Sequence, residues 1–226
     1  MAAEFELRVA NEELRLLGDR AVYWPARRRL LIADLHLGKA DVFRRAGIGL
    51  PQGGTAHDLQ RLSRLLLETT ATELWILGDM LHGPAPQAAW RDSWNAWRGQ
   101  HAGLRIVALA GNHDRALAPA GLGIELAGES VEEGALVMRH EPRPHPHRHV
   151  LCGHVHPLAT LPGIRRRWPA FWLRDGITVL PAFSHFTAGV APRLFQGERL
   201  VACVEGEVVA LPAPRATVGS RQHSAT

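Results

Sequence analysis

The chain has 226 residues, a length that suits one α/β domain with a sizeable core better than two full domains. Two cysteines exclude a disulfide framework, and no apolar run approaches the ~20 residues of a membrane-spanning helix. We therefore expect a cytoplasmic protein that contacts no membrane. The formal charge of +4 comes almost entirely from arginine, with Lys39 the only lysine, which indicates either an arginine-rich genome or a surface suited to a polyanion.

Short strands are predicted in the first 33 residues, because apolar and polar residues alternate there between turn signals such as Gly18-Asp19. The predicted strands span residues 5–9, 14–17, 21–24 and 29–33. Residues 34–51 are predicted to form a loop with basic side chains. A helix is predicted over 55–70, where Thr55 and Asp58 resemble a capping box and leucines recur at helical spacing.

Strands and helices alternate through the middle of the chain, where strands 74–77 and 106–110 flank a helix predicted over 87–101. The helix carries three tryptophans on one stripe, which favours a role in the core over base stacking: Trp90, Trp94 and Trp97. Further strands are predicted at 131–133, 135–139, 150–152, 170–173, 177–180, 200–205 and 208–211. This pattern predicts one domain over 1–211, built from two packed sheets with helices outside, and a disordered tail over 212–226.

Five short polar stretches stand out because each contains carboxylate, amide or imidazole side chains, and four of them follow an apolar run predicted as a strand. They are Asp34-Leu35-His36, Gly78-Asp79, Gly111-Asn112-His113-Asp114, Arg139-His140 and Gly153-His154-Val155-His156. Polar side chains at the carboxyl ends of buried strands are typical of an α/β functional site. One stretch alone is unspecific, but the ordered set predicts a single site.

The side chains of these stretches form a mixed nitrogen and oxygen ligand set without a thiolate. Asp34 and His36 stand two apart on a segment expected to be extended, so both would face one cation, and His154 and His156 form a similar pair. The two oxygens of Asp79 are enough to bridge two metal ions. The ligand types suit Mn²⁺, Fe or Zn²⁺ and do not distinguish among them.

Two metal ions ~3.5–4 Å apart would favour phosphoryl transfer, because they generate a hydroxide at neutral pH and neutralise phosphate oxygens. His113 adjoins the expected ligand Asn112 and is expected to contact the substrate, as an acid at the leaving oxygen or as a cation near the developing charge. Asp114 is expected to orient His113 or to raise its pKa. Four further side chains are candidates for substrate contact: Lys39, Arg44, Arg45 and His82.

Together, the five stretches resemble the signature of the calcineurin-like metallophosphoesterases over residues 34–156. The resemblance implies an α/β fold in four layers, α-β-β-α, in which a two-sheet β-sandwich is flanked by helices and holds metals at its edge. It implies two divalent metal ions, with Asp34, His36, Asp79 and His156 as ligands of the first and Asp79, Asn112, His140 and His154 as ligands of the second. His113 matches the catalytic histidine of that family.

A narrower resemblance, to the ligase-associated DNA damage response endonucleases known as PdeM, covers about residues 5–211. It includes Asp34-Leu-His-Leu-Gly-Lys39, Phe43-Arg44, Gly47, Pro51, Arg115, Pro157, Leu180-Pro-Ala-Phe183 and Phe186-Thr187. It implies Mn²⁺-dependent cleavage of phosphodiester bonds in bacterial DNA repair, in association with an ATP-dependent DNA ligase, a helicase and an exonuclease. Ser184 and Ala188 stand where that pattern has glycine.

The sequence therefore predicts a binuclear metal-dependent phosphodiesterase that acts as an endonuclease on single-stranded or structured DNA. Phosphomonoesters, nucleotides and cyclic nucleotides are alternative substrates, because fold and metals do not choose the substrate. A non-catalytic scaffold of a repair complex is a further alternative, although such a protein would be expected to lack ligands that this chain keeps. Arg27–Arg29 and Arg165–Arg167 are interpreted as solvated surface, and the loop 145–149 and His185 are left unassigned.

Overall fold

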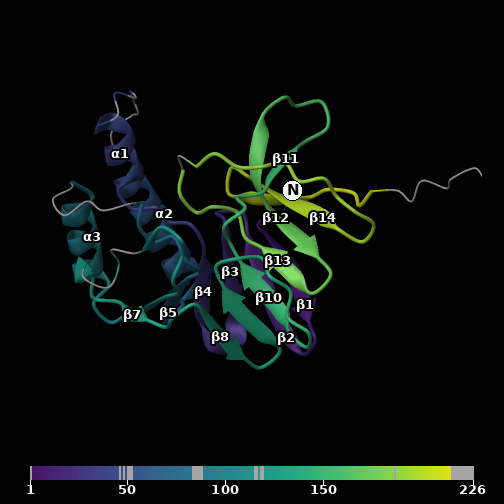
Figure 1. The fold of residues 1–226 in the computed structure, drawn as a ribbon, viewed down its shortest axis with the longest axis horizontal. Helices are drawn as coiled ribbons and strands as arrows, with labels where there is room; N and C mark the ends of the chain where they lie inside the picture. Colours follow the sequence, from purple (N-terminus) through teal and green to yellow (C-terminus); the bar gives the residue numbers. More distant parts are fainter. Residues whose placement is uncertain are drawn as a thin grey trace, which may run out of the picture.

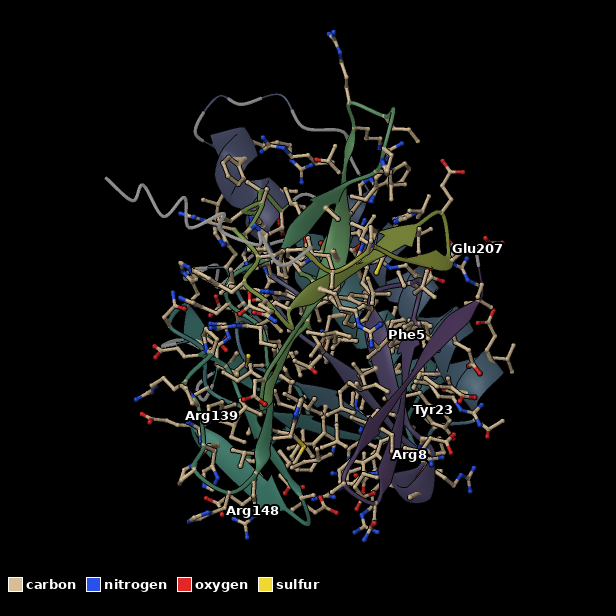
Figure 2. The ribbon with its side chains drawn as sticks, turned by 90° about the vertical axis from the view of Figure 1, so that its right-hand side faces the viewer. Phe5, Arg8, Tyr23, Arg139, Arg148 and Glu207 are labelled. Atoms are coloured by element: carbon tan, nitrogen blue, oxygen red, sulfur yellow. The ribbon has the colours of Figure 1, made fainter. Side chains whose placement is uncertain are left out.

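Two β-sheets pack face to face in the computed structural model, which describes residues 2–45, 47, 49, 53–82, 89–114, 117, 120–185 and 187–214 (Figure 1). Within these residues the first sheet has seven strands in sequential order: β1 (Glu4–Val9), β2 (Glu12–Leu17), β3 (Ala21–Trp24), β4 (Arg29–Ile32), β5 (Glu73–Ile76), β6 (Arg105–Ala108) and β7 (Glu125–Leu126). The second contains β8 (Ser130–Glu133), β9 (Leu136–Arg139), β10 (His149–Cys152), β11 (Leu158–Thr160), β12 (Arg167–Arg174), β13 (Ile177–Val179), β14 (Arg199–Val204) and β15 (Glu207–Ala210). Figure 2 shows the sheets from the side, with Arg8 and Tyr23 on the first and Arg139 on the second.

Parallel strands form one half of the first sheet and lie inside the second, and their connections explain why. The hairpins from β1 to β4 give antiparallel pairs, whereas β4, β5, β6 and β7 are joined by longer segments and pair in parallel. In the second sheet β9, β10 and β13 are likewise parallel. Because a parallel set ends at one edge, the loops after β4, β5, β6, β9, β10 and β13 meet there.

The described residues contain three α-helices, all on the outer side of the first sheet: α1 (Lys39–Arg45), α2 (Gly54–Thr69) and α3 (Ala89–Gln100) (Figure 1). The short 3-10 helix η1 (Pro25–Arg27) connects β3 to β4. Leucines of α2 and the tryptophans of α3 pack against this face, while the other face packs on the second sheet. The predicted sandwich of two sheets with flanking helices is confirmed. In the described part of the chain, the α-helices all lie on the side of the first sheet.

The predicted stripe of α3 is confirmed as core, because Trp90, Trp94 and Trp97 are each at most 5% exposed. Cys152 and Cys203 are both buried and free. No helix in the described part of the chain combines the length and the apolar character that a membrane crossing requires. Of the predicted tail only residues 212–214 are described.

Two local predictions on the helical side are wrong. The segment 34–51 was predicted to be a loop, but it contains α1, a helix of seven residues. The capping box of α2 is not formed, since its N-cap is Gly53 without a side-chain hydrogen bond. Asp58 instead pairs with Arg61 and accepts a hydrogen bond from the backbone N–H of His185. The carboxylate therefore ties α2 to a distant segment rather than to its own helix end.

Arg29 contradicts the interpretation of Arg27–Arg29 as solvated surface, because it is only 5% exposed. Its guanidinium lies 2.8 Å from Glu73 and 2.6 Å from Glu133, and its centre is 4.1 Å from the Trp75 ring. The two glutamates belong to different sheets, β5 and β8. Arg29 therefore joins the sheets through a buried ion network, whereas Arg27 and Arg28 are exposed as predicted.

Replacing Arg29 with methionine is expected to lower the free energy of unfolding by about 2–3 kcal/mol at pH 7, because both carboxylates lose a buried partner. Partial burial acts to raise the pKa of Glu73 and of Glu133, but hydrogen bonds that include those from Arg29 leave both pKa values lowered. A lowered folded pKa adds stability above the unfolded value of about 4.3 and loses it as pH falls through the folded value. Urea unfolding should therefore show the difference shrinking below about pH 4.

Arg105 offers a matched control for this experiment, because it contacts Glu73 as well but its side chain is 48% exposed. Exposed ion pairs contribute little, so Arg105→Met should cost less than about 1 kcal/mol. Equal losses from the two variants at pH 7 would contradict the role given to Arg29.

Candidate metal centre

The loops that follow the parallel strands are hydrogen-bonded to one another at one edge of the sandwich. The backbone N–H groups of Asp34 and His36 donate to the carbonyl oxygens of Gly78 and Asp79, at 3.2 and 2.9 Å. From the second sheet, the N–H of Gly153 donates to the His140 carbonyl at 3.0 Å. The N–H of His154 reaches the Asp34 carboxylate at 3.0 Å, so the loops of the two sheets meet.

Five of the candidate ligands have a backbone conformation that non-glycine residues rarely adopt. The φ angle is 57° at Asp34, 50° at His36, 50° at Asp79, 73° at His154 and 52° at His156. Such conformations cost of order 1–3 kcal/mol each and cluster at functional sites. The expectation of extended segments is therefore wrong, and the paired residues do not simply share one side of a strand.

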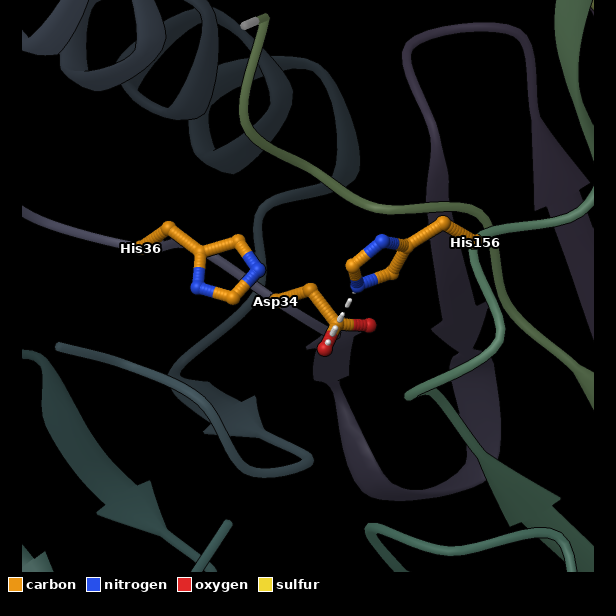
Figure 3. A group of neighbouring side chains, drawn as sticks. All are labelled: Asp34, His36 and His156. Atoms are coloured by element: carbon orange, nitrogen blue, oxygen red, sulfur yellow. Dashed lines mark ion pairs between the residues drawn. The ribbon is translucent and has the colours of Figure 1, made fainter. Parts of the chain in front are cut away.

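Asp34, His36 and His156 form the first group of side chains that can hold a metal ion (Figure 3). The Nε2 atom of His156 lies 3.2 Å from Oδ1 of Asp34, and the rings of His36 and His156 are 5.4 Å apart. Figure 3 shows Asp34 and His36 on one segment of the chain and His156 reaching them from another. Burial lowers the pKa of His36 to about 2, so this imidazole is neutral and can donate a lone pair.

Buried atoms without hydrogen-bond partners mark the same group. Within the described structure they include Oδ1 of Asp34, both ring nitrogens of His36 and Nε2 of His156. Leaving one such polar atom unsatisfied costs about 1–3 kcal/mol. A divalent cation would satisfy these atoms together, and a carboxylate with two neutral imidazoles suits such an ion. The residues therefore fit the metal that their chemistry implies.

A second group contains Asp34, Asp79 and His140. Nε2 of His140 lies 3.5 Å from Oδ2 of Asp79 and 2.9 Å from Oδ1 of Asn112. Nδ1 of His154 is 3.1 Å from the same His140 nitrogen and 3.2 Å from the Asn112 oxygen. Two imidazole nitrogens, an amide oxygen and a carboxylate thus converge, and all seven candidate ligands from the sequence lie in the two groups or against them.

Two of the histidines are oriented by backbone carbonyl groups. Nδ1 of His140 lies 3.0 Å from the carbonyl oxygen of Leu77, and Nδ1 of His156 lies 3.0 Å from that of Ala188. A carbonyl oxygen can only accept, so Nδ1 carries a proton in both rings and Nε2 is the nitrogen left to bind a metal ion. This arrangement fixes which nitrogen of each ring would face a metal ion. No pattern in the sequence predicts either of these carbonyl partners.

The charges around the second group favour a cation. Burial acts to raise the pKa of Asp79, yet hydrogen bonds from His140 and from the backbone of His113 leave it lowered to about 2. Burial acts to lower the pKa of His140, but the Asp79 hydrogen bond and the nearby carboxylates leave it raised. Because a metal ligand must be deprotonated, a bound cation would lower this pKa again.

Asp34, rather than Asp79, is the carboxylate common to both groups. Its side chain is fully buried, and Oδ1 lies 4.0 Å from Nδ1 of His140 as well as close to His156. The bridging role predicted for Asp79 stays a prediction.

Two glycines are required for the close approach of these loops. A Cβ atom added to Gly111 would overlap the backbone and carboxylate of Asp79, and one added to Gly153 would overlap Ala33 and the Asp34 carboxylate. Neither glycine has a positive φ, so the requirement is steric. The glycines of the motifs thus leave room for the two carboxylates.

His113 lies beside the second group with its ring accessible. Its side chain is 44% exposed, and Nε2 is 3.9 Å from Oδ2 of Asp79. The backbone N–H of His113, not its ring, donates to Oδ1 of Asp79 at 3.0 Å. The ring is therefore placed to meet a substrate while the main chain fixes the loop.

Asp114 differs from its expected role. Its buried carboxylate accepts hydrogen bonds from the backbone N–H groups of Leu81, Gly111 and Met80, at 2.9, 3.0 and 3.3 Å. No hydrogen bond from Asp114 to the His113 ring is formed within the described residues. Asp114 thus holds the loops after β5 and β6 together, and it positions His113 only through the backbone.

The candidates for substrate contact fall into two sets. Nζ of Lys39 donates to Oγ1 of Thr187 at 3.2 Å, and burial lowers the pKa of Lys39. The His82 ring lies 5.3 Å from that of His36 and 5.2 Å from that of His113, so both Lys39 and His82 adjoin the centre. Arg44 instead forms an ion pair with Asp41 on α1. The side chain of Arg45 lies outside the described residues, as do Pro51, Arg115 and Phe186.

A cleft of about 330 Å³ opens beside the second group. Asn112 and His140 line it together with Arg139 and Arg143, two basic residues that the sequence analysis did not assign. The only available signal was the position of Arg139 directly before His140. Another cleft, of about 450 Å³, lies between β1, β2 and α2, away from the candidate ligands, and we assign the chemistry to the smaller one.

Comparison with known proteins agrees with this geometry. A model of the calcineurin-like phosphoesterase family matches residues 27–187. The crystal structure of Pseudomonas putida nuclease MPE shares 38% identity and a TM-score of 0.79, covering 92% of this chain and 100% of that one. Yfce, a phosphoesterase from E. coli, shares 16% identity and a TM-score of 0.47, covering 80% and 96%. No curated protein matches the chain. The match of the family model over most of the chain, together with the similar nuclease structure, shows that this protein belongs to the calcineurin-like phosphoesterase family of metal-dependent enzymes.

Proposed function

We propose that the chain is a binuclear metal-dependent phosphodiesterase that cleaves DNA as an endonuclease, with Mn²⁺ as its metal. The observation that carries the proposal is the convergence of two ligand groups on one buried carboxylate beside an open cleft. The similarity to a protein described as a nuclease, over nearly the whole of both chains, supports a nucleic acid as the substrate. Association with an ATP-dependent DNA ligase, a helicase and an exonuclease stays a prediction from the family resemblance.

The candidate ligands divide between two ions as the family resemblance implies. Asp34, His36 and His156 would hold one ion, and Asn112, His140 and His154 would hold the other, with Asp79 between them. Bound divalent ions would lower the pKa of a water molecule and neutralise the charge of a phosphate group.

The remaining side chains act on the substrate. His113 protonates the leaving oxygen when the phosphorus–oxygen bond breaks, because its exposed ring lies next to the second group. Lys39 adds positive charge on the side of the first group. Burial lowers the pKa of Lys39, and the negative charges of Asp34 and Asp79 act to raise it. The carbonyl groups of Leu77 and Ala188 keep the rings of His140 and His156 in place.

Small phosphate esters remain the second candidate, because the cleft of about 330 Å³ lies in the usual range for small-ligand pockets. A plasmid-nicking assay with Mn²⁺, Fe²⁺, Zn²⁺ or Mg²⁺ should be run beside hydrolysis of p-nitrophenyl phosphate and bis-p-nitrophenyl phosphate. We expect nicking with Mn²⁺ and hydrolysis of the diester in preference to the monoester. Cleavage of small esters with the plasmid intact throughout a salt series would show that the nuclease proposal is wrong.

A further inference from the structure

A two-stranded arm projects from the second sheet next to the metal centre. We define the arm as residues 158–169, which comprise β11, the start of β12 and the segment between them. β11 lies outside the main strand order and pairs with β12 from Leu158 opposite Pro169 to Thr160 opposite Arg167. In Figure 1 the arm rises at the top, beyond the body of the sandwich. It therefore presents surface that the core does not use.

The base of the arm is fixed to the site. The arm begins two residues after His156, whose carbonyl oxygen accepts a hydrogen bond from the N–H of Val190 at 3.1 Å. The N–H of Leu158 donates in turn to the Val190 carbonyl at 2.8 Å. The direction in which the arm leaves the body is thus set beside a candidate metal ligand.

The arm carries a concentrated positive charge. Arg165, Arg166 and Arg167 are all exposed, and residues 157–173 contain no Asp or Glu. In the described part of the chain no carboxylate forms an ion pair with any of the three. Neighbouring positive charges repel one another, so binding of a polyanion, which supplies negative charge, is energetically favourable at these three residues.

Several arginines elsewhere on the surface have acidic partners. Arg64 pairs with Asp19, Arg105 with Glu73 and Glu125, and Arg148 with Glu132. Other exposed arginines, such as Arg8 and Arg199, also form no ion pair within the described residues. The arm differs from them because it carries three such arginines in succession.

Arg166 of the arm is also oriented by an aromatic ring, and it lies close enough to His185 to affect its pKa. The guanidinium of Arg166 lies 3.9 Å from the centre of the Trp168 ring, and such stacking holds a guanidinium in place. Burial lowers the pKa of His185, and nearby cations, Arg20 and Arg166 among them, lower it further. Next to His185, the N–H of Ser184 donates to the Asp34 carbonyl at 3.2 Å.

We propose that the arm is a second binding site for the nucleic-acid backbone, which holds phosphates away from the bond that is cleaved. This inference rests on the proposed function and adds to it a determinant of substrate length. Pro169 pairs with Leu158 at the base of the arm, and Arg165 is four residues from Pro169, so at about 3.3 Å per residue Arg165 reaches at most about 13 Å from the base. A strand of duplex DNA covers that distance in about four nucleotides, at about 3.4 Å each. Only substrates that extend about this far to one side can use the arm.

The test compares two triple variants of the Mn²⁺-loaded enzyme. The first, Arg165→Gln with Arg166→Gln and Arg167→Gln, removes the charge of the arm. The control removes the same charge from strands on the body, with Arg8→Gln, Arg15→Gln and Arg199→Gln; Arg8 lies at the opposite end of the molecule from the arm in Figure 2. The measurement is kcat/KM for cleavage of a 30-nucleotide single strand at several salt concentrations.

Each phosphate contact contributes about 0.7 to the slope of log affinity against log salt for single strands. The arm variant should therefore lose about 2 units of slope and about tenfold in kcat/KM at moderate salt, while the control loses less than twofold. With oligonucleotides that extend fewer than about four nucleotides on either side, wild type and arm variant should converge. Bis-p-nitrophenyl phosphate is too short to reach the arm, so its hydrolysis should be retained.

The outcomes are distinguishable. An unchanged slope in the arm variant, with wild type cleaving DNA, overturns the arm proposal and leaves the proposed function standing. A wild type that hydrolyses the small diester but no DNA overturns both. If the triple variant loses the small-diester activity through misfolding, the single variants Arg165→Gln and Arg167→Gln decide, each with an expected slope loss of about 0.7. No slope loss in either would equally reject the arm.

Discussion

An Asp79→Asn variant is expected to lose affinity for both metal ions and to lower turnover more than 100-fold. Asparagine keeps the size of the side chain but removes the negative charge. Its amide hydrogens would face groups that now donate a hydrogen bond to the carboxylate or form an ion pair with it. Those groups are the backbone N–H of His113 and the ring of His140. Replacing a residue that only supports a metal ligand lowers the metal affinity 10–100-fold, so replacing a direct ligand should lower it further.

Metal content after gel filtration and calorimetric titration with Mn²⁺ would measure the effect without reference to activity. Asp175→Asn provides the control, because Asp175 is exposed in the turn between β12 and β13. Asp34→Asn tests the alternative that the geometry raises, since Asp34 is common to both groups. If Asp79→Asn loses one ion while Asp34→Asn loses both, Asp34 is the shared ligand. Two ions bound to Asp79→Asn at wild-type affinity would contradict the proposed centre.

The positions of most strands were predictable because these strands are amphipathic or wholly apolar over several residues. The exceptions are short: β7 has two residues and β11 has three, too few for an alternating pattern to be visible. Helix α1 was missed because its seven residues complete fewer than two turns, with too few apolar positions to show a helical period. Local pattern reading fails where an element is shorter than the period that identifies it.

Contacts over long sequence separations were the second limit. Arg29 reads as part of a basic run, yet its partners Glu73 and Glu133 lie 44 and 104 residues away. Asp58 reads as a cap, but the N–H that it accepts belongs to His185, 127 residues away. Such partners depend on how the two sheets pack, and no local pattern encodes them.

The candidate ligands show the same division. Their residue types and order in the sequence indicated a common site, and the structure brings them together. Spacing suggested that His154 and His156 face one cation, but they point to different groups, because both have left-handed backbone conformations. Chemistry was therefore visible in the sequence, whereas the division between ions depended on the loop geometry.

Turnover of a His113→Gln variant is expected to fall 10²–10⁴-fold while its metal content stays at the wild-type level. The variant separates catalysis from folding, because the loop is anchored by the backbone N–H of His113 and by Asp114, which the substitution leaves in place. His147→Gln, in the exposed loop before β10, is the matched control. A loss of metal together with activity would instead make His113 a structural residue of the centre.

The choice of substrate tests the role of the proton. Cleavage of DNA releases an alkoxide, which needs a proton as it leaves, whereas p-nitrophenolate is a stable anion and needs none. If His113 donates that proton, His113→Gln should slow DNA cleavage much more than hydrolysis of bis-p-nitrophenyl phosphate. Equal losses on the two substrates would show that the ring stabilises charge on the phosphate group instead. Undiminished turnover on both would remove His113 from the mechanism, and the exposed ring beside Asp79 would then require another explanation.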